Sequence, residues 1–168
     1  SIVESEEVVY SINTGFGPLS RITIPKEEVD TLQLNFVRSH ACGTGEHLPK
    51  DIARAMMLLR ANTLAKGYSG VRPEVVQLLI DLLNTDVHPV IPCQGSVGAS
   101  GDLAPLAHLA LVLIGEGRGY DDDGNLMTGK EVLDSVDLKP ITLKAKEGLA
   151  LVNGTQMMSA LGALTLLD

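Results

Sequence analysis

The sequence predicts an all-α fold, and we expect residues 1–168 to form a single helical segment of a larger, mostly helical protein. Two observations lead to this prediction. Apolar residues recur at helical spacing in four separate parts of the chain. Prolines stand where most of these parts begin, and glycines or polar turns stand where they end. Long polar loops that contain glycine are expected to join the helices.

The first helix is predicted to begin at Pro25, because the amide hydrogen that proline lacks has no partner in the first turn of a helix. It runs toward Ala41 and ends before Gly43 and Gly45. Its apolar positions stand three or four residues apart, as expected for one face of a helix: Val29, Leu32, Phe36 and Val37.

Two further helices follow the same rules. The stretch LPKDIARAMMLLRANTLAKG, residues 48–67, begins at a proline, ends at Gly67 and carries apolar side chains on one face. The stretch RPEVVQLLIDLLN, residues 72–84, begins at Pro73 and closes before a His-Pro pair.

The second half of the chain is predicted to hold three more helical parts. One runs from Asp102 to about Leu113, directly after a polar turn. A short helix lies near residues 130–136, after a turn-rich connection. The stretch KEGLALVNGTQMMSALGALTLLD, residues 146–168, reads as a helix that is first broken and then continuous.

Composition and charge exclude several classes of protein. The net charge of −8 argues against binding to nucleic acid or to an anionic membrane, because both attract basic surfaces. Hydrophobic residues make up 45% of the chain and aromatic residues only 3%, so we expect an aliphatic core. The longest apolar run, residues 103–115, is too short to span a bilayer.

The two cysteines indicate the cellular compartment, and the two ends of the chain indicate that it is part of a longer protein. Cys42 and Cys93 are far apart and form no CxxC pair, which is typical of a reducing compartment. No signal-peptide pattern opens the chain, so we expect a cytoplasmic protein. The chain starts without Met and stops at Asp168 inside an apolar helical pattern, so we expect a segment of a longer protein.

No metal site is predicted. His40, Cys42 and His47 lack a standard zinc-ligand spacing and would need a fourth ligand. The acidic stretch 121–125 resembles a calcium-binding loop, but its glycine stands at the wrong offset and no glutamate stands at the twelfth position. We expect a solvated turn there, and we expect His47, His88 and His108 on solvated loops or on a helix face.

The polar turn GSVGASG, residues 95–101, contains the tripeptide Ala99-Ser100-Gly101, which could do chemistry as well as turn the chain. Glycine has the least hindered amide nitrogen and tolerates unusual backbone angles. If the turn presses the Gly101 nitrogen onto the Ala99 carbonyl carbon, a five-membered ring closes with loss of water. Loss of the Ser100 hydroxyl then leaves a methylidene group, which is a stronger electrophile than any standard side chain. Alone, however, such a tripeptide is ordinarily just a turn.

The surrounding motifs give the tripeptide a context. GSVGASGDLAPLAHLAL resembles the signature of the aromatic amino acid ammonia-lyases. VYSINTGFG, RSHACGTGEHL, LLRANTLAKGYSGVRPE and KEGLALVNGTQMM resemble further motifs of that family, in the same order and at similar spacing. The resemblance covers essentially the whole chain. It implies a prosthetic group, 4-methylideneimidazole-5-one (MIO), formed autocatalytically from Ala99, Ser100 and Gly101 without an external cofactor.

The resemblance also implies roles for two side chains that face the substrate. Tyr10 matches the loop tyrosine that acts as base for the β-proton, although such a ring alone could equally be a packing residue. Ser11 stands where glycine is usual, which slightly stiffens this loop. His40 matches the position that faces the substrate side chain, although a histidine late in a helix could equally cap it or lie in the core.

Two further residues complete the implied site. Asn153 matches an asparagine near the prosthetic group and the amino acid substrate, with the alternative that it caps a helix beginning near Gly154. Asp102 is implied to support formation of the ring, although an acid in the first turn of a helix needs no such role.

The resemblance implies a carbon–nitrogen lyase, and its histidine-type members eliminate ammonia from L-histidine to give trans-urocanate. The Ser-His-Ala pattern at 39–41 resembles that type, whereas phenylalanine-type members have Phe-Leu and tyrosine-type members have His-Leu at the last two positions. A phenylalanine or tyrosine ammonia-lyase or an aminomutase of the family is one alternative, and an inert helical fragment is another. Family members are homotetramers, and their later segments supply a second tyrosine loop, a carboxylate-binding arginine and a glutamate that this chain does not contain.

Overall fold

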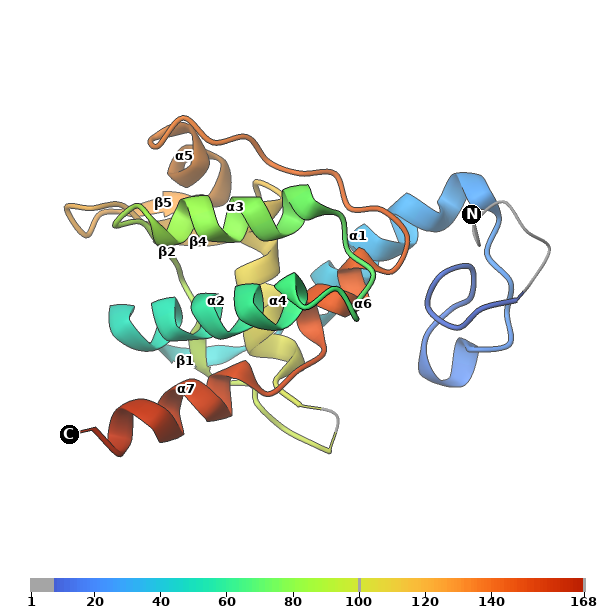
Figure 1. The fold of residues 1–168 in the computed structure, drawn as a ribbon, viewed down its shortest axis with the longest axis horizontal. Helices are drawn as coiled ribbons and strands as arrows, with labels where there is room; N and C mark the ends of the chain where they lie inside the picture. The colour runs from blue at the N-terminus through green and yellow to red at the C-terminus, as the bar shows by residue number, and fades with distance from the viewer. Residues whose placement is uncertain (1–7, 100, 168) are drawn as a thin grey trace.

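The computed structural model of the protein describes residues 8–99 and 101–167. Its α-helices enclose one apolar core, and short strands lie at its edges (Figure 1). The helices are α1 (Val29–His40), α2 (Lys50–Ala65), α3 (Pro73–Leu83), α4 (Leu103–Leu113), α5 (Gly129–Asp134), α6 (Glu147–Val152) and α7 (Gln156–Thr165). Two short 3-10 helices, η2 (Gly17–Leu19) and η3 (Lys26–Glu28), precede α1. The helical prediction is confirmed.

Helix α4 is the centre of the fold. Eight of its eleven residues are buried, and it contacts α1, α3, α5, α6 and α7. Its sequence LAPLAHLALVL is apolar all round, as expected for a helix surrounded by others. Leucine, valine, isoleucine, alanine and methionine fill the core around it, in agreement with the aliphatic composition. No helix in the described ranges is both long enough and apolar enough to cross a membrane.

The predicted helices are observed with small shifts at their ends. Pro25 is followed by the 3-10 turn η3, and the regular helix begins only at Val29. The short helix α5 begins at a capping box, in which Thr128 and Glu131 each bind the other's backbone amide. The broken helix at the end of the chain is α6 followed by α7, with residues 153–155 between them.

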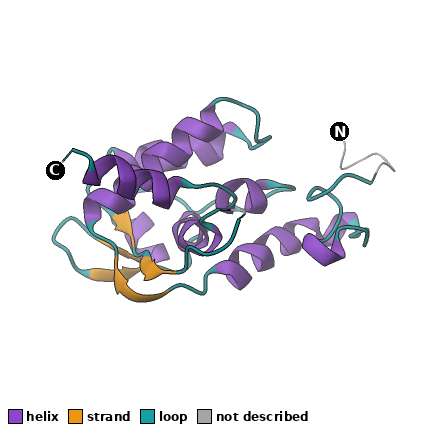
Figure 2. Cartoon of the chain, turned by 90° about the horizontal axis from the view of Figure 1, so that it is seen from below, coloured by secondary structure: helices purple, strands orange, loops and turns teal. Residues whose placement is uncertain are grey.

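Two small antiparallel sheets occupy parts of the chain that were expected to be loops. Strand β1 (Thr44–His47) pairs with β3 (Pro92–Gln94), and β4 (Arg118–Tyr120) lies between β2 (His88–Pro89) and β5 (Leu126–Thr128). Figure 2 shows these strands gathered on one side of the helices. None is longer than four residues, so none repeats its side-chain alternation often enough to be recognised in the sequence.

The prediction that His88 lies on a solvated loop or a helix face is wrong. His88 is 7% exposed in strand β2, and its ring stacks on Tyr120 at 5.3 Å between centroids. Burial lowers the pKa of His88, so its ring is held neutral in the fold. The neighbouring valines at 87 and 90 are buried as well, which explains why this short strand lies inside.

An ion pair between the buried Glu147 and the partly exposed Arg72 fixes the start of helix α6. Glu147 is 1% exposed, and Oε1 accepts hydrogen bonds from the Arg72 backbone amide at 3.0 Å and from Arg72 Nε at 2.9 Å. Its Oε2 accepts from Arg72 Nη2 at 2.9 Å and from the Lys144 amide at 2.8 Å. Burial raises the pKa of Glu147, but these hydrogen bonds outweigh it and leave the pKa below its usual value. The pair ties the beginning of α3 to that of α6.

Replacing Glu147 with Gln should destabilise the protein by about 2 kcal/mol at pH 7, since the amide loses the charge and one acceptor. Because the folded pKa is lowered, the contribution of Glu147 is present above the usual value of 4.5 and is lost as pH falls through the folded value. The free energy of unfolding of Glu147→Gln, measured by urea denaturation, should therefore approach that of the parent at pH values below the folded pKa of Glu147. If the free energies of unfolding of parent and variant differed by the same amount at pH 7 and at acid pH, the ion-pair account would be contradicted.

Candidate active site

The polar turn that carries the tripeptide ends in a tightly packed glycine. Gly101 is buried and has a φ of +108°, a backbone conformation that favours glycine. A Cβ added at this position would overlap the carbonyl oxygen of Gly154. Ala99 is exposed, and Ser100 lies outside the described residues. The chain therefore turns sharply at Gly101, with the segment after α6 directly against it.

Asp102 is the buried acid behind this turn. It is 0% exposed, and its backbone amide donates to the carbonyl of Gly154 at 2.6 Å. Its Oδ1 accepts from the Ser96 hydroxyl at 2.5 Å, and its Oδ2 accepts from the Met158 amide at 3.0 Å. One side chain therefore joins the beginning of the polar turn to the first turn of α7.

Two helix N-termini meet at Asp102. It is the residue immediately before α4, and the Met158 amide that it binds lies in the first turn of α7. The first amides of a helix carry partial positive charge, which favours anionic groups nearby. The prediction that Asp102 lies at the start of a helix is thus confirmed. Its side chain also caps α7, which is distant in sequence.

Asn153 ends α6 rather than beginning α7. It is the C-terminal cap of α6, with an extended backbone at φ −90° and ψ 106°. Thr155 is the residue immediately before α7, so the alternative that Asn153 caps a following helix is wrong. The reason is the Gly154–Thr155 step, which places α7 two residues later than its pattern indicated. Asn153 is exposed, and its carbonyl accepts from Arg60 Nη2 at 2.7 Å.

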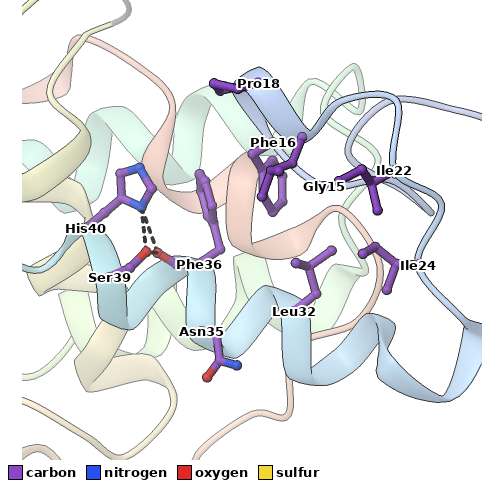
Figure 3. Close-up of a pocket in the computed structure, with 12 residues that line it drawn as sticks. Gly15, Phe16, Pro18, Ile22, Ile24, Leu32, Asn35, Phe36, Ser39 and His40 are labelled. Atoms are coloured by element: carbon purple, nitrogen blue, oxygen red, sulfur yellow. Dashed lines mark hydrogen bonds between the residues drawn. The ribbon is translucent and has the colours of Figure 1, made fainter.

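The loop that carries Tyr10 and the end of α1 line an apolar cavity of about 500 Å³ (Figure 3). The loop contributes residues from Gly15 to Ile24, and α1 contributes Leu32, Phe36 and His40. The Phe16 ring packs on the Phe36 ring at 4.0 Å between centroids. This contact joins the loop to the helix.

His40 is the polar end of this cavity. Its Nδ1 lies 2.8 Å from the Phe36 carbonyl oxygen, and its ring packs 4.2 Å from that of Phe36 (Figure 3). A carbonyl oxygen can only accept a hydrogen bond, so in this contact Nδ1 carries the hydrogen. In the neutral ring Nε2 is then left as an acceptor. The Ser39 hydroxyl, at 3.1 Å from Nδ1, supports the same orientation.

Tyr10 is half exposed, with 51% of its surface accessible. Its hydroxyl oxygen accepts a long hydrogen bond of 3.4 Å from the Gly17 amide, and its ring meets the edge of Phe16 at 6.4 Å. The next residue, Ser11, is buried with φ +63°, the left-handed region where glycine is unstrained. The backbone at this position therefore has the conformation that glycine would adopt more easily.

The predicted site residues thus form two groups. His40 lines the cavity beside α1, and Tyr10 lies next to it through its contact with Phe16, whereas Gly101, Asp102 and Asn153 lie around the ends of α4, α6 and α7. In Figures 1 and 2 the loop of residues 8–24 lies beside α1, away from the polar turn. The structure therefore does not bring Tyr10 to the tripeptide.

His108, for which no role was expected, links the two groups. Its Nε2 accepts from the Gly43 amide at 3.0 Å, three residues after His40. A Cβ added at Gly95 would lie 3.2 Å from the Cα of Gly43, so the polar turn packs against the same segment. Burial lowers the pKa of His108, which keeps Nε2 free to accept. A single polar residue within the apolar run of α4 was the available signal.

The described residues contain no cluster of three or more histidine, cysteine or acidic side chains placed to hold a metal ion. A constrained glycine next to a buried acid suits a rearrangement of the backbone at residues 99–101, which requires close approach of main-chain atoms.

Comparison with known proteins finds similar enzymes. The model of the family "Aromatic amino acid lyase" matches residues 1–168. A histidine ammonia-lyase from Gloeobacter violaceus is 59% identical over 165 residues, which cover 98% of this chain and 32% of that protein. The chain thus spans about a third of the length of the curated relatives it matches.

Solved structures agree in fold. The crystal structure of histidine ammonia-lyase from Trypanosoma cruzi matches with a TM-score of 0.89 and 46% identity, covering 99% of this chain and 31% of that one. Tyrosine aminomutase from Streptomyces globisporus matches with the same TM-score of 0.89 and 42% identity, covering 98% and 31%. With a family match over its whole length and a shared fold, the chain belongs to the aromatic amino acid lyase family.

Proposed function

We propose that the full-length protein containing this chain eliminates ammonia from L-histidine to give trans-urocanate. The observation that carries the proposal is the packing of Gly101, in a left-handed conformation beside the buried Asp102, in a chain of the aromatic amino acid lyase family. The relatives named histidine ammonia-lyase, at 55–59% identity, support the choice of substrate. In this proposal the chain is the region that forms the prosthetic group.

The residues present fit the formation of MIO from Ala99, Ser100 and Gly101. The Gly101 nitrogen would bond to the Ala99 carbonyl carbon, whose oxygen leaves as water, and Ser100 would lose its hydroxyl and α-hydrogen as a second water. The tight packing of Gly101 against Gly154 limits the conformations that the turn can take. Asp102 lies next to the ring-forming residues and is proposed to support that reaction. The finished group supplies an electrophile that increases the ability of ammonia to leave.

Tyr10 is proposed as the base that removes the β-proton of the substrate. Within residues 8–24 the Tyr10 phenol is the most acidic hydroxyl, since the other hydroxyls of the loop belong to serine and threonine. The loop lies away from the polar turn in the structure, so the proposal requires it to lie over the turn when substrate is bound. The 3.4 Å hydrogen bond between Tyr10 and Gly17 lies within the loop, so the contact that has to open in this movement is that of Phe16 with Phe36.

His40 is proposed to bind the imidazole ring of the substrate. Its Nδ1 is held by the Phe36 carbonyl, so Nε2 can accept a hydrogen bond from an imidazole N–H. The phenyl ring of Phe36 beside it suits a flat aromatic substrate. Asn153, at the end of α6, is proposed to bind the amino acid part of the substrate, since its exposed amide can both donate and accept.

The proposal also covers assembly and location. Apolar side chains on and beyond α7 are exposed, including Leu166 at 88% and Leu167 at 82%. Such surfaces are ordinarily covered by further protein, and we propose that the full-length protein forms a homotetramer. Cys42 and Cys93 are both free and exposed, which is compatible with the proposed cytoplasmic location.

Ser100→Ala should abolish formation of the prosthetic group, because alanine has no hydroxyl to lose. In full-length protein, mass spectrometry of a peptide spanning residues 95–110 should find the parent lighter by two waters. The variant should lack that loss and the near-ultraviolet absorbance. Ser159→Ala, on an exposed part of α7, is the matched control and should keep the loss. A parent of unmodified mass in every preparation would favour the inert helical fragment.

Tyr10→Phe should keep the prosthetic group and the fold while lowering kcat for L-histidine by roughly 10²–10⁴-fold, the usual contribution of general-base catalysis. The substitution removes the hydroxyl and leaves the contact with Phe16 in place. Tyr68→Phe removes a hydroxyl from a residue that is 90% exposed and should leave kcat unchanged. Near-normal turnover in Tyr10→Phe would return Tyr10 to a packing role and place the base elsewhere.

His40→Leu should lower kcat/KM for L-histidine by roughly 10–100-fold, corresponding to the loss of one hydrogen bond in a desolvated site. The added apolar surface should at the same time improve the relative use of phenylalanine. His47→Leu, at an exposed position of β1, should change neither value. Substrate profiling of the parent decides between the family alternatives, since faster deamination of tyrosine or formation of a β-amino acid would overturn the substrate assignment.

A further inference from the structure

A buried arginine lies behind the segment against which the tripeptide packs. Arg60, in the middle of α2, is only 2% exposed. Burial lowers the pKa of Arg60 to about 10, so the guanidinium is still charged at neutral pH. In the described part of the chain no carboxylate pairs with it, and its Nε has no hydrogen-bond partner. A cation buried without an acid costs free energy, so its hydrogen bonds must compensate.

Those hydrogen bonds all go to the end of α6, the residue after it and the start of α7. Nη2 donates to the carbonyls of Ala150 and Asn153, the latter at 2.7 Å. Nη1 donates to the Gln156 side-chain oxygen at 3.1 Å. The carbonyls at the end of a helix carry partial negative charge and otherwise lack partners, so a cation there is favourable. Arg60 therefore clamps the end of one helix to the beginning of the next.

The residue between these contacts is Gly154. A Cβ added to it would lie 2.5 Å from Arg60 Nη1, so the guanidinium sets how closely this backbone can approach α2. The Gly154 carbonyl accepts from the Asp102 amide at 2.6 Å and crowds Gly101. Arg60 and Gly101 thus both pack against the same glycine.

We propose that Arg60 is a positioning residue for formation of the prosthetic group. It holds residues 150–156 so that the Gly154 carbonyl stays pressed against Gly101 and Asp102. When the clamp is loosened, the turn gains conformations in which the Gly101 nitrogen points away from the Ala99 carbonyl, and ring closure slows. This inference rests on the proposed function, because it concerns the same prosthetic group.

The chain offers a matched control on the same helix. Arg54, also in α2, donates from Nη1 to the Thr85 carbonyl at 2.6 Å and from Nη2 to the Leu83 carbonyl at 2.7 Å. These carbonyls lie at the end of α3, which is not part of the polar turn or of residues 150–156. Substitutions at Arg54 and Arg60 therefore remove the same type of contact from one helix, but only Arg60 acts on the segment against Gly101.

The experiment compares Arg60→Lys, Arg60→Met, Arg54→Lys and Arg54→Met in full-length protein. In soluble protein with parent-like circular dichroism, the fraction of the 95–110 peptide that has lost two waters is measured by mass spectrometry. We expect the Arg54 variants to match the parent in this fraction even if their thermal midpoints fall. Arg60→Met should lower it at least tenfold, and Arg60→Lys, which keeps the charge without the planar fork, should lower it less.

Folded Arg60 variants that reach the parent fraction as fast as the parent would overturn the inference. If Arg60→Met does not fold, Arg60→Lys decides the matter by its rate of water loss in newly synthesised, still unmodified chains made in a cell-free reaction, for which a parent-like rate is the contradicting result. A parent that never loses two waters would contradict the proposed function itself. Water loss in the parent and in both Arg60 variants alike would overturn only the role of Arg60.

Discussion

The contact between the Asp102 amide and the Gly154 carbonyl connects the parts of this molecule that matter for its chemistry. Asp102 stands immediately before the central helix α4, and its carboxyl group also binds the first turn of α7. Gly154 stands between α6 and α7, and both Arg60 and Gly101 pack against it. Without this contact the three helices would keep their apolar packing, but the polar turn would have no fixed surface to press against.

The helices could be predicted because each repeats its apolar spacing over several turns and is bounded by proline, an acidic residue or glycine. Helix α3, which begins at Pro73, is an example. The strands could not, because each pairs with a segment far away in sequence and is too short to show alternation. His88 shows the consequence. Its burial depends on β4 and on the Tyr120 ring, neither of which a local pattern around residue 88 can report.

The candidate site shows a similar division. Family resemblance indicated Tyr10, His40, Asn153 and the tripeptide, because those residues stand in recognisable motifs. Arg60 and His108 escaped notice because each is a lone polar residue in a helix with an otherwise apolar face, and their importance lies in backbone groups that they bind. Every residue has the same backbone groups, so a sequence does not show which of them a side chain binds. The loop of residues 8–24 lies away from the polar turn because Phe16 packs on Phe36, and this contact cannot be predicted from the spacing of motifs along the chain.

The placement of Gly154 against Gly101 has a consequence for the order of events during biosynthesis. The tripeptide emerges from the ribosome well before the segment that confines it, and α2, which holds that segment, is made earlier still. The turn is therefore free in the growing chain and becomes confined only when α6 has docked onto α1 and α4, and α7 onto α2. A backbone reaction that depends on this confinement is timed by folding, so its product would record that a given molecule has reached its native packing at least once.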